Sequence, residues 1–269
     1  MTIDTTWHFH RESYTSPNRP VGPLSRACPS LAFYTRVTRI VLCASAMARQ
    51  GRYDYRAWTS SSEDVIAALE SVGCRFHVEG LQHLDALDRP CVFIGNHMST
   101  LETFALPAII VPHIGDLTYV VKRSLVEYPV FKHVMRSRNP IVVDRVNPRD
   151  DLKAVMEQGA ERLAAGYSVC IFPQHTRAVD FDPEQFNSIG IKLAARTSSP
   201  VIPIALETAA WAHGKLLKDY GRIHPRRAIH FAFGAPFTVS GKGSEEHQRI
   251  IRFIQEHLAR WRQGSDSGA

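Results

Sequence analysis

The sequence predicts an α/β protein in which helices flank a mainly parallel central sheet of about seven strands, preceded by an amphipathic helix. The 269 residues are 44% hydrophobic and 22% charged, an ordinary globular balance in a chain long enough for a sizeable core. From about Cys74, short apolar segments alternate with stretches of helical periodicity. Such alternation is typical of βαβ units, which build parallel sheets that are buried on both faces.

The chain divides into three parts. Residues 1–29 are polar and rich in proline, which is typical of an arm that lies on the surface or is poorly ordered. Residues 30–50 have the periodicity of one amphipathic helix. Residues 51–269 form the main domain, which carries the alternating strands and helices.

The helix over 30–50 has one apolar face, made by residues at spacings of three and four. These residues are Phe33, Tyr34, Val37, Ile40, Val41, Ala44, Met47 and Ala48. Two interpretations stay open: a helix that packs into the core, or an interfacial helix with its apolar face in lipid and its arginines at the head groups. Because Arg36 and Arg39 interrupt the segment, we do not expect it to span a membrane.

The predicted strands are short apolar segments, and most are separated by helical stretches. The strands are expected at 74–78, 91–95, 117–121, 141–144, 167–172, 201–206 and 228–233. The helices are expected at 100–110, 129–137, 148–165, 184–197 and 245–261. The helix over 148–165 has the clearest signals, because Pro148 suits a first turn and Gly166 follows the apolar stripe.

Charge and cysteine content narrow the classes of function. With 32 Lys and Arg against 26 Asp and Glu, the net charge of +6 favours anionic partners such as lipid head groups, phosphorylated substrates or nucleic acid. The five cysteines show no Cys-x-x-Cys spacing, so neither a disulfide framework nor a zinc site is expected. The first residues contain no apolar secretory segment, and a cytoplasmic setting is therefore the default expectation.

The segment 95–102, directly after a predicted strand, is the most informative for chemistry. The carboxyl ends of parallel strands are where α/β proteins bind ligands. His97 there can act as a general base oriented by Glu102, provided that His97 lies in the turn and Glu102 in the first turn of the helix. The alternatives are that Ser99 and Glu102 form a helix-capping box and that His97 is an ordinary loop histidine.

Residues 96–102, Asn-His-Met-Ser-Thr-Leu-Glu, resemble the His-x4-acid motif of the glycerolipid acyltransferases, a family that includes bacterial 1-acylglycerol-3-phosphate acyltransferases. Four further blocks resemble the family in the same order. They are 119–125 with its lysine, 140–145 ending in Asp-Arg, 172–177 (Phe-Pro-Gln-His-Thr-Arg) and 201–205. The resemblance covers roughly residues 91–206 and implies that 51–269 is an acyltransferase domain.

The resemblance implies transfer of a fatty acyl group from a thioester, acyl-CoA or acyl carrier protein, to a lysophospholipid hydroxyl. The first expectation is 1-acylglycerol-3-phosphate as acceptor, giving phosphatidic acid. His97 would deprotonate the hydroxyl, Glu102 would stabilise the imidazolium, and backbone N–H groups at the start of the next helix could bind the oxyanion. No cofactor, metal or acyl-enzyme is expected. Another lipid acceptor, or a non-catalytic lipid-binding relative, stays open as an alternative.

The same resemblance implies which residues bind the substrate. They are Lys122, Arg145, Gln174, Thr176 and Arg177. The cations among them would hold a phosphate, for which the arginine fork is suited, although each could instead be a solvated surface charge.

Three positions depart from the family's pattern. Glu102 stands in place of the more familiar aspartate, and Gln174 replaces a glutamate. His175 replaces a glycine, so a positive φ there would cost about 1 kcal/mol and put the identity of the acceptor in doubt.

Two other classes of function are less well supported. A metallohydrolase with His97, Glu102 and His175 as ligands matches no familiar metal spacing. A nucleic-acid-binding protein fits the charge, but no aromatic-basic motif or helix-turn-helix signal supports it. The expected partners are therefore the thioester donor, the lysophospholipid and an anionic membrane surface, with the protein peripheral or monotopic on the cytoplasmic face.

Overall fold

The computed structural model describes residue 9, residues 12–214 and residues 218–266. Eight strands form one sheet in the order β1-β2-β8-β7-β3-β6-β4-β5. The strands are β1 Ser13–Thr15, β2 Arg75–Glu79, β3 Val92–Gly95, β4 Leu117–Lys122, β5 Ile141–Val143, β6 Ser168–Ile171, β7 Val201–Glu207 and β8 Ala228–Phe233. Neighbouring strands are parallel except in the pairs β1–β2 and β7–β8. The prediction of a mainly parallel sheet with helices on its flanks is confirmed.

All seven predicted strands are present, and β1 is an additional one. Its three residues pair antiparallel with β2 at the edge of the sheet, with Tyr14 opposite Val78. The Tyr14 and Ser16 hydroxyls both donate to the Glu70 carboxylate, at 2.6 Å each. Part of the predicted arm is therefore tied to the sheet, while its residues 1–8 and 10–11 lie outside the described residues.

The predicted helices are present, and three α-helices that were not predicted are added. The α-helices are α1 Pro23–Ala27, α2 Pro29–Arg49, α3 Tyr55–Glu70, α4 Gln82–Asp85, α5 Leu101–Ile114, α6 Phe131–Arg136, α7 Pro148–Ala164, α8 Ile189–Thr197 and α9 Ser244–Asp266. The additional helices are α1, within the predicted arm, and α3 and α4, within the main domain. The signal for α3 was its cap, since the Asp54 carboxylate accepts the Ala57 N–H at 2.9 Å.

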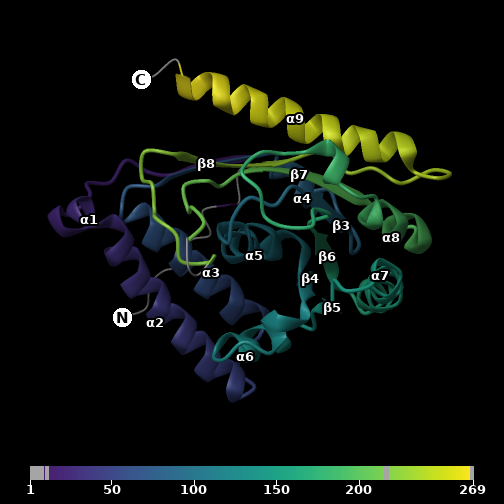
Figure 1. Ribbon diagram of the computed structural model, residues 1–269, viewed down its shortest axis with the longest axis horizontal. Coiled ribbons are helices and arrows are strands. Elements are labelled where there is room, and N and C mark those ends of the chain that lie inside the picture. The colour runs from purple at the N-terminus through teal and green to yellow at the C-terminus, as the bar shows by residue number, and fades with distance from the viewer. Residues whose placement is uncertain (1–8, 10–11, 215–217, 267–269) are drawn as a thin grey trace.

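Two hydrophobic clusters lie on opposite faces of the sheet. The first joins the sheet to α2, α3 and α5 through residues such as Phe33, Leu69 and Leu106. The second joins it to α7, α8 and α9 through residues such as Val155 and Ile254. In Figure 1 the sheet accordingly lies between α9 on one side and α2, α3 and α5 on the other.

The chain leaves the neighbouring strands β3 and β6 in opposite directions. From β3 it runs through α5, on the first face, to β4 on the far side of β6. From β6 it runs through α8, on the second face, to β7 on the far side of β3. Such a reversal opens a crevice at the carboxyl ends of the two strands, and α/β proteins bind ligands there.

Helix α2 is packed on one face and exposed on the other. Phe33, Val37 and Ala44 are buried against the first cluster, whereas Leu31 and Leu42 are 65% and 52% exposed. The interpretation of α2 as a core-packing helix is thus confirmed for one face. The other face carries leucines that no neighbouring helix in the described chain covers fully.

We predicted that Arg36 and Arg39 keep this helix from spanning a membrane. By length and composition alone, that prediction is wrong. With 21 residues and a mean hydropathy of 1.2, α2 is long and apolar enough to cross a membrane. A mostly buried core helix passes the same test, but only 22% of the most apolar 18-residue stretch of α2 is buried inside the protein. Phe33 and Val37 therefore pack one face of α2 against the core, while most of the helix surface lies outside it.

Candidate active site

Most of the predicted site residues lie at one edge of the sheet. His97 follows β3, Gln174 follows β6, Lys122 ends β4 and Arg145 follows β5. These strands are mutually parallel and adjacent, so their carboxyl ends meet at the same edge. His97 and Gln174 lie after the carboxyl ends of β3 and β6, from which the chain departs in opposite directions. The sequence analysis missed Thr208, which directly follows β7 at this edge.

Asn96 fixes the backbone just before His97. Its side-chain amide donates to the Leu206 carbonyl at 2.8 Å, and its carbonyl oxygen accepts the Leu206 N–H at 2.9 Å. These bonds continue the β3–β7 pairing for one further step after Gly95, which lies opposite Ile204. At Gly95 a β-carbon would come within 3.0 Å of the Ile204 carbonyl oxygen, so the close approach of the two strands favours glycine.

His97 and Glu102 meet as the sequence analysis requires for a base and its orienting acid. His97 lies in the turn and Glu102 in the first turn of α5, with His97 Nδ1 3.3 Å from Glu102 Oε2. The Glu102 side chain is fully buried, whereas the His97 side chain is 17% exposed. The imidazole also stacks on Phe172, with ring centroids 4.4 Å apart and planes within 9°. The ring is thus held by an acid on one side and an aromatic face on the other.

The Glu102 carboxylate also completes the start of α5. It accepts the N–H groups of Met98 at 2.8 Å and Ser99 at 2.9 Å, and the Thr208 hydroxyl at 2.6 Å. The Ser99 hydroxyl accepts the Leu101 N–H at 3.1 Å. The two interpretations of Glu102, as a capping residue and as the partner of His97, are therefore both met by one carboxylate.

Opposing effects act on the pKa of Glu102. Complete burial by itself raises the pKa of this carboxyl. The contact with His97, the Thr208 hydroxyl and the Ser99 N–H outweigh burial, so the pKa of Glu102 lies below its ordinary value. A carboxylate that stays charged in the interior is suited to stabilise an imidazolium.

Gln174 contacts His97 through the backbone. Its side-chain oxygen accepts the His97 N–H at 2.5 Å, and the side chain is buried. The predicted oxyanion donors after His97 are also engaged, because the N–H groups of Met98, Ser99 and Leu101 donate to protein oxygens. In this conformation those three N–H groups are not free to bind an oxyanion, so the prediction is narrowed to the other N–H groups of the first turn of α5.

The predicted cations are spread along the same edge with different partners. Arg177, with its side chain 20% exposed, donates to Asp219 at 2.6 Å and to the Thr100 hydroxyl. Arg145 is exposed and donates to the His175 carbonyl. Thr176 and Lys122 are exposed, and no contact of either contradicts or supports a role in binding.

The expected strain at His175 is absent. In the described part of the chain the non-glycine residues with positive φ are Val130, Asn139, Arg145 and Ser198, not His175. The left-handed backbone is instead at Arg145, with φ 58°, where the Asp151 carboxylate accepts its N–H at 3.0 Å. The β-carbon of His175 therefore carries no backbone penalty, and the residue is exposed.

Several residues at the site carry no sequence signal of their own. Thr208 contacts Glu102, and His213 Nε2 lies 2.7 Å from the Met98 carbonyl oxygen. Asp219 pairs with Arg177. Thr208, His213 and Asp219 come from the connection between β7 and β8, which the family motifs do not reach. In the described part of the chain, no group of three His, Cys, Asp or Glu residues is placed to hold a metal ion.

Comparison with known proteins agrees with this geometry. A family model described as Acyltransferase matches residues 75–207, from the first residue of β2 to the last of β7. The 1-acyl-sn-glycerol-3-phosphate acyltransferase of Pseudomonas aeruginosa is 32% identical over 192 residues, which cover 70% of each chain. A chloroplastic protein of the same name from Brassica napus is 29% identical over 130 residues, which cover 48% of this chain and 36% of that protein.

A solved structure shows the same fold. The crystal structure of the 1-acyl-sn-glycerophosphate acyltransferase PlsC from Thermotoga maritima matches with a TM-score of 0.67 and 17% identity. The match covers 87% of this chain and 94% of that one. Residues 75–207, which the family model matches, include His97 and Glu102. The match to the Pseudomonas relative includes them too, because 192 residues of a 269-residue chain must span its middle. The chain belongs to the acyltransferase family.

Proposed function

We propose that this protein transfers a fatty acyl group from a thioester to the free hydroxyl of 1-acylglycerol-3-phosphate, which gives phosphatidic acid. The observation that carries the proposal is the His97–Glu102 pair beside the carboxyl ends of β3 and β6. Relatives that bear the name of this activity support the choice of acceptor. The donor is acyl-CoA or an acyl carrier protein, used as co-substrate and without a further cofactor.

His97 acts as the general base in the proposed reaction. With Nδ1 turned to Glu102, Nε2 takes the proton of the acceptor hydroxyl as its oxygen attacks the thioester carbonyl carbon. The carbon–sulfur bond of the resulting tetrahedral intermediate breaks, and the imidazolium returns the proton to the leaving thiolate. Glu102 stays charged throughout and stabilises the imidazolium, as its lowered pKa allows.

The phosphate of the acceptor is held by cations beside the pair. Arg177 contacts the segment that carries the base, because it donates to Thr100, three residues after His97. Arg145 approaches the same segment through the His175 carbonyl, and Lys122 ends the strand between β6 and β5. Gln174 shapes the site by holding the His97 backbone, and Thr176 lies beside Arg177 in the sequence.

The proposal is tested with the purified full-length protein, acyl-CoA and a panel of acceptors. The panel contains 1-acylglycerol-3-phosphate, a phosphodiester lysophospholipid and a neutral monoacylglycerol, with thiol release and lipid product as readouts. We expect the fastest turnover with the phosphate monoester. A protein that binds lipid but consumes no thioester with any acceptor would instead be a non-catalytic relative, and fastest turnover with another acceptor would reassign the substrate.

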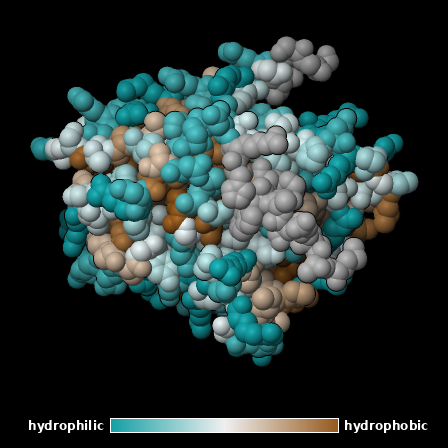
Figure 2. Space-filling view, turned by 180° about the vertical axis from the view of Figure 1, so that it is seen from behind, coloured by the Kyte–Doolittle hydropathy of each residue, from teal (hydrophilic) through white to brown (hydrophobic). Residues whose placement is uncertain are grey.

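The protein also has to reach a bilayer, because both acceptor and product carry acyl chains. Leu31 and Leu42 lie on one face of α2, about 20° apart at roughly 100° per residue. Leu24 of α1 is 71% exposed, and Figure 2 shows an apolar patch at the margin where α1 lies. With Arg26 and Arg39 nearby in the sequence, these leucines support a peripheral or monotopic position on an anionic, cytoplasmic membrane surface.

Because α2 packs into the core, the membrane proposal is tested on the full chain. Glutamate at both Leu31 and Leu42 should weaken co-sedimentation with anionic vesicles, since it removes apolar area and adds charges of the wrong sign. Val146→Glu is the matched control, because Val146 is 87% exposed and belongs to the distant connection between β5 and α7. Equal vesicle binding by the double variant and the control would place the membrane contact elsewhere.

A further inference from the structure

The guanidinium of Arg177 is already paired with a protein carboxylate. Its Nη1 lies 2.6 Å from Asp219 Oδ1 and also donates to the Thr100 hydroxyl. The Thr100 hydroxyl donates in turn to the same Asp219 oxygen, at 2.9 Å. One oxygen of Asp219 thus accepts from both an arginine and a hydroxyl. An oxygen of a bound phosphate makes the same kinds of bond.

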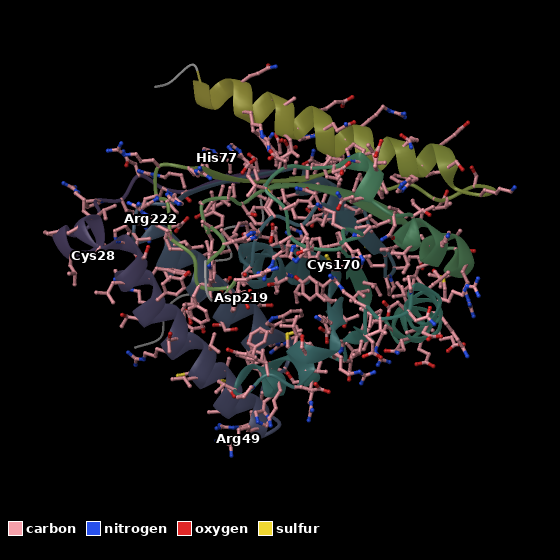
Figure 3. The ribbon with its side chains drawn as sticks, viewed as in Figure 1. Cys28, Arg49, His77, Cys170, Asp219 and Arg222 are labelled. Atoms are coloured by element: carbon pink, nitrogen blue, oxygen red, sulfur yellow. The ribbon has the colours of Figure 1, made fainter. Side chains whose placement is uncertain are left out.

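The position of this carboxylate is one that suits an anion. Thr100 immediately precedes α5, and the first turn of a helix carries a partial positive charge. Thr100 lies three residues after His97, so the Asp219 carboxylate is held beside the reacting centre and not on a distant surface. Figure 3 shows Asp219 on the side of the β7–β8 connection that faces α2 and α5.

Asp219 is held in place from behind by its own backbone. The Trp211 indole N–H donates to the Asp219 carbonyl at 3.1 Å, and Trp211 packs edge-on against Phe33 of α2. Two residues on, the Tyr34 hydroxyl donates to the Gly221 carbonyl at 2.5 Å. The Asp219 side chain itself is 49% exposed. The carboxylate can therefore turn into solvent while its backbone stays anchored.

We propose that Asp219 is a specificity-determining residue. In the free protein its carboxylate pairs with Arg177 at the position where the acceptor's phosphate binds, and the phosphate displaces it. This inference rests on the proposed function, in which Arg177 binds that phosphate. Since only the fraction of molecules with Arg177 free can bind, every anionic ligand of this position is weakened by the same factor. Acceptor and product carry the same phosphate, so Asp219 also favours release of the product.

The test compares the parent protein with Asp219→Asn, which removes the charge and keeps the shape. We expect the KM for 1-acylglycerol-3-phosphate and the Ki of inorganic phosphate to fall together, by about 1.5- to 5-fold, the range for a partly exposed ion pair that must open first. The KM for a neutral monoacylglycerol should not change. Asp88→Asn is the matched control, because Asp88 is exposed and precedes β3 at the opposite edge of the sheet.

Phosphate binding is also measured without turnover, from the concentration of inorganic phosphate that raises the melting temperature of each variant. A lower half-saturating concentration for Asp219→Asn supports the proposal even if the substitution lowers stability. An unchanged or higher value for KM, Ki and half-saturation overturns it, because Asp219 would then be indifferent to the anion or would orient Arg177 for binding.

The failure of this inference is distinguishable from the failure of the proposed function. Arg177→Ala should raise the KM for the phosphate monoester, and adding Asp219→Asn to it should have no further effect. If Arg177→Ala leaves that KM unchanged, the phosphate site itself is misplaced. If Arg177→Ala raises the KM but Asp219→Asn does not lower it, only the role of Asp219 is wrong.

Discussion

The two ends of the site are built differently. At the buried end, Glu102 is fully enclosed, and its partners come from the ends of β3, α5 and β7. At the cationic end, Arg145 and Arg177 are exposed or partly exposed and contact the His175 carbonyl and Asp219. The comparison indicates a rigid proton-transfer end that is ordered before substrate arrives, and an anion-binding end whose internal partners a phosphate can replace.

The largest expected effect comes from removing the imidazole of His97, the reactive group of the rigid end. His97→Ala should lower kcat by about 10²–10⁴-fold, the usual contribution of a general base. Some stability should be lost as well, because the ring stacks on Phe172 and its contact with Glu102 helps to keep that buried carboxylate charged. The measurement is thioester turnover beside a melting curve. Turnover that survives in a folded variant would remove His97 from the mechanism.

Glu102→Gln should reduce both rate and stability. A loss of rate would show that Glu102 does more than cap the start of α5. The amide cannot stabilise an imidazolium, and charged hydrogen bonds are worth roughly 1.5–3 kcal/mol. We therefore expect a loss of about 10- to 150-fold in kcat and a lower melting temperature. Loss of stability with full activity would show that Glu102 only completes the start of α5.

The pH dependence of stability gives an independent check on Glu102. Its pKa is lowered in the folded protein, so the stability that it contributes is present above the ordinary carboxyl pKa. That contribution is lost as the pH falls from the ordinary pKa through the lowered one. Melting temperatures of the parent and Glu102→Gln should therefore converge on acidification, and a constant difference would contradict the lowered pKa.

Substitutions at the cationic end should change affinity and spare kcat. Arg145→Ala removes a fork that can turn from the His175 carbonyl to a phosphate, which is worth about 10-fold in KM for a phosphorylated acceptor. A neutral acceptor is the control, because it lacks the group that Arg145 binds. Equal losses with both acceptors would mean that Arg145 stabilises its left-handed turn beside Asp151 and does not bind substrate.

The two ends also differ in how far the sequence predicted them. The order of strands and helices, and the motifs after β3 and β6, placed His97, Glu102 and Gln174 together, because parallel strands bring their carboxyl ends to one edge. Local spacing could not separate the two roles of Glu102, since one carboxylate serves both. The hydrogen bond from the His97 N–H to the Gln174 side chain could not be predicted either, because no sequence pattern shows whether a side chain binds backbone or ligand.

Site residues that come from segments distant in the sequence could not be predicted. Thr208 and Asp219 lie on a connection with no motif, 106 and 42 residues from the side chains that they contact. The short edge strand β1 was missed because three residues show too little alternation to be distinguished from an arm. The strain assigned to His175 belonged to Arg145, since a glycine at a family position does not by itself fix φ in this chain.

The smallest expected effect concerns Thr208, the long-range support of the rigid end. Thr208→Val keeps the shape but removes the hydroxyl that Glu102 accepts at 2.6 Å and that receives the Ser99 hydroxyl at 3.1 Å. A lost hydrogen bond to a charged carboxylate costs roughly 1.5–3 kcal/mol of stability. If Thr208 also tunes the His97–Glu102 pair, kcat should fall by about 2- to 10-fold.

Thr197→Val is the matched control for that change. It removes a part-buried hydroxyl that donates to the Leu193 carbonyl at 2.9 Å in α8, away from the His97–Glu102 pair. The control should lose stability without losing rate, whereas Thr208→Val should lose both, with the activity of Thr208→Val extending less far toward acid as the pKa of Glu102 rises. Identical behaviour of the two variants would mean that the rigid end needs only its local contacts from α5, and that β7 contributes packing alone.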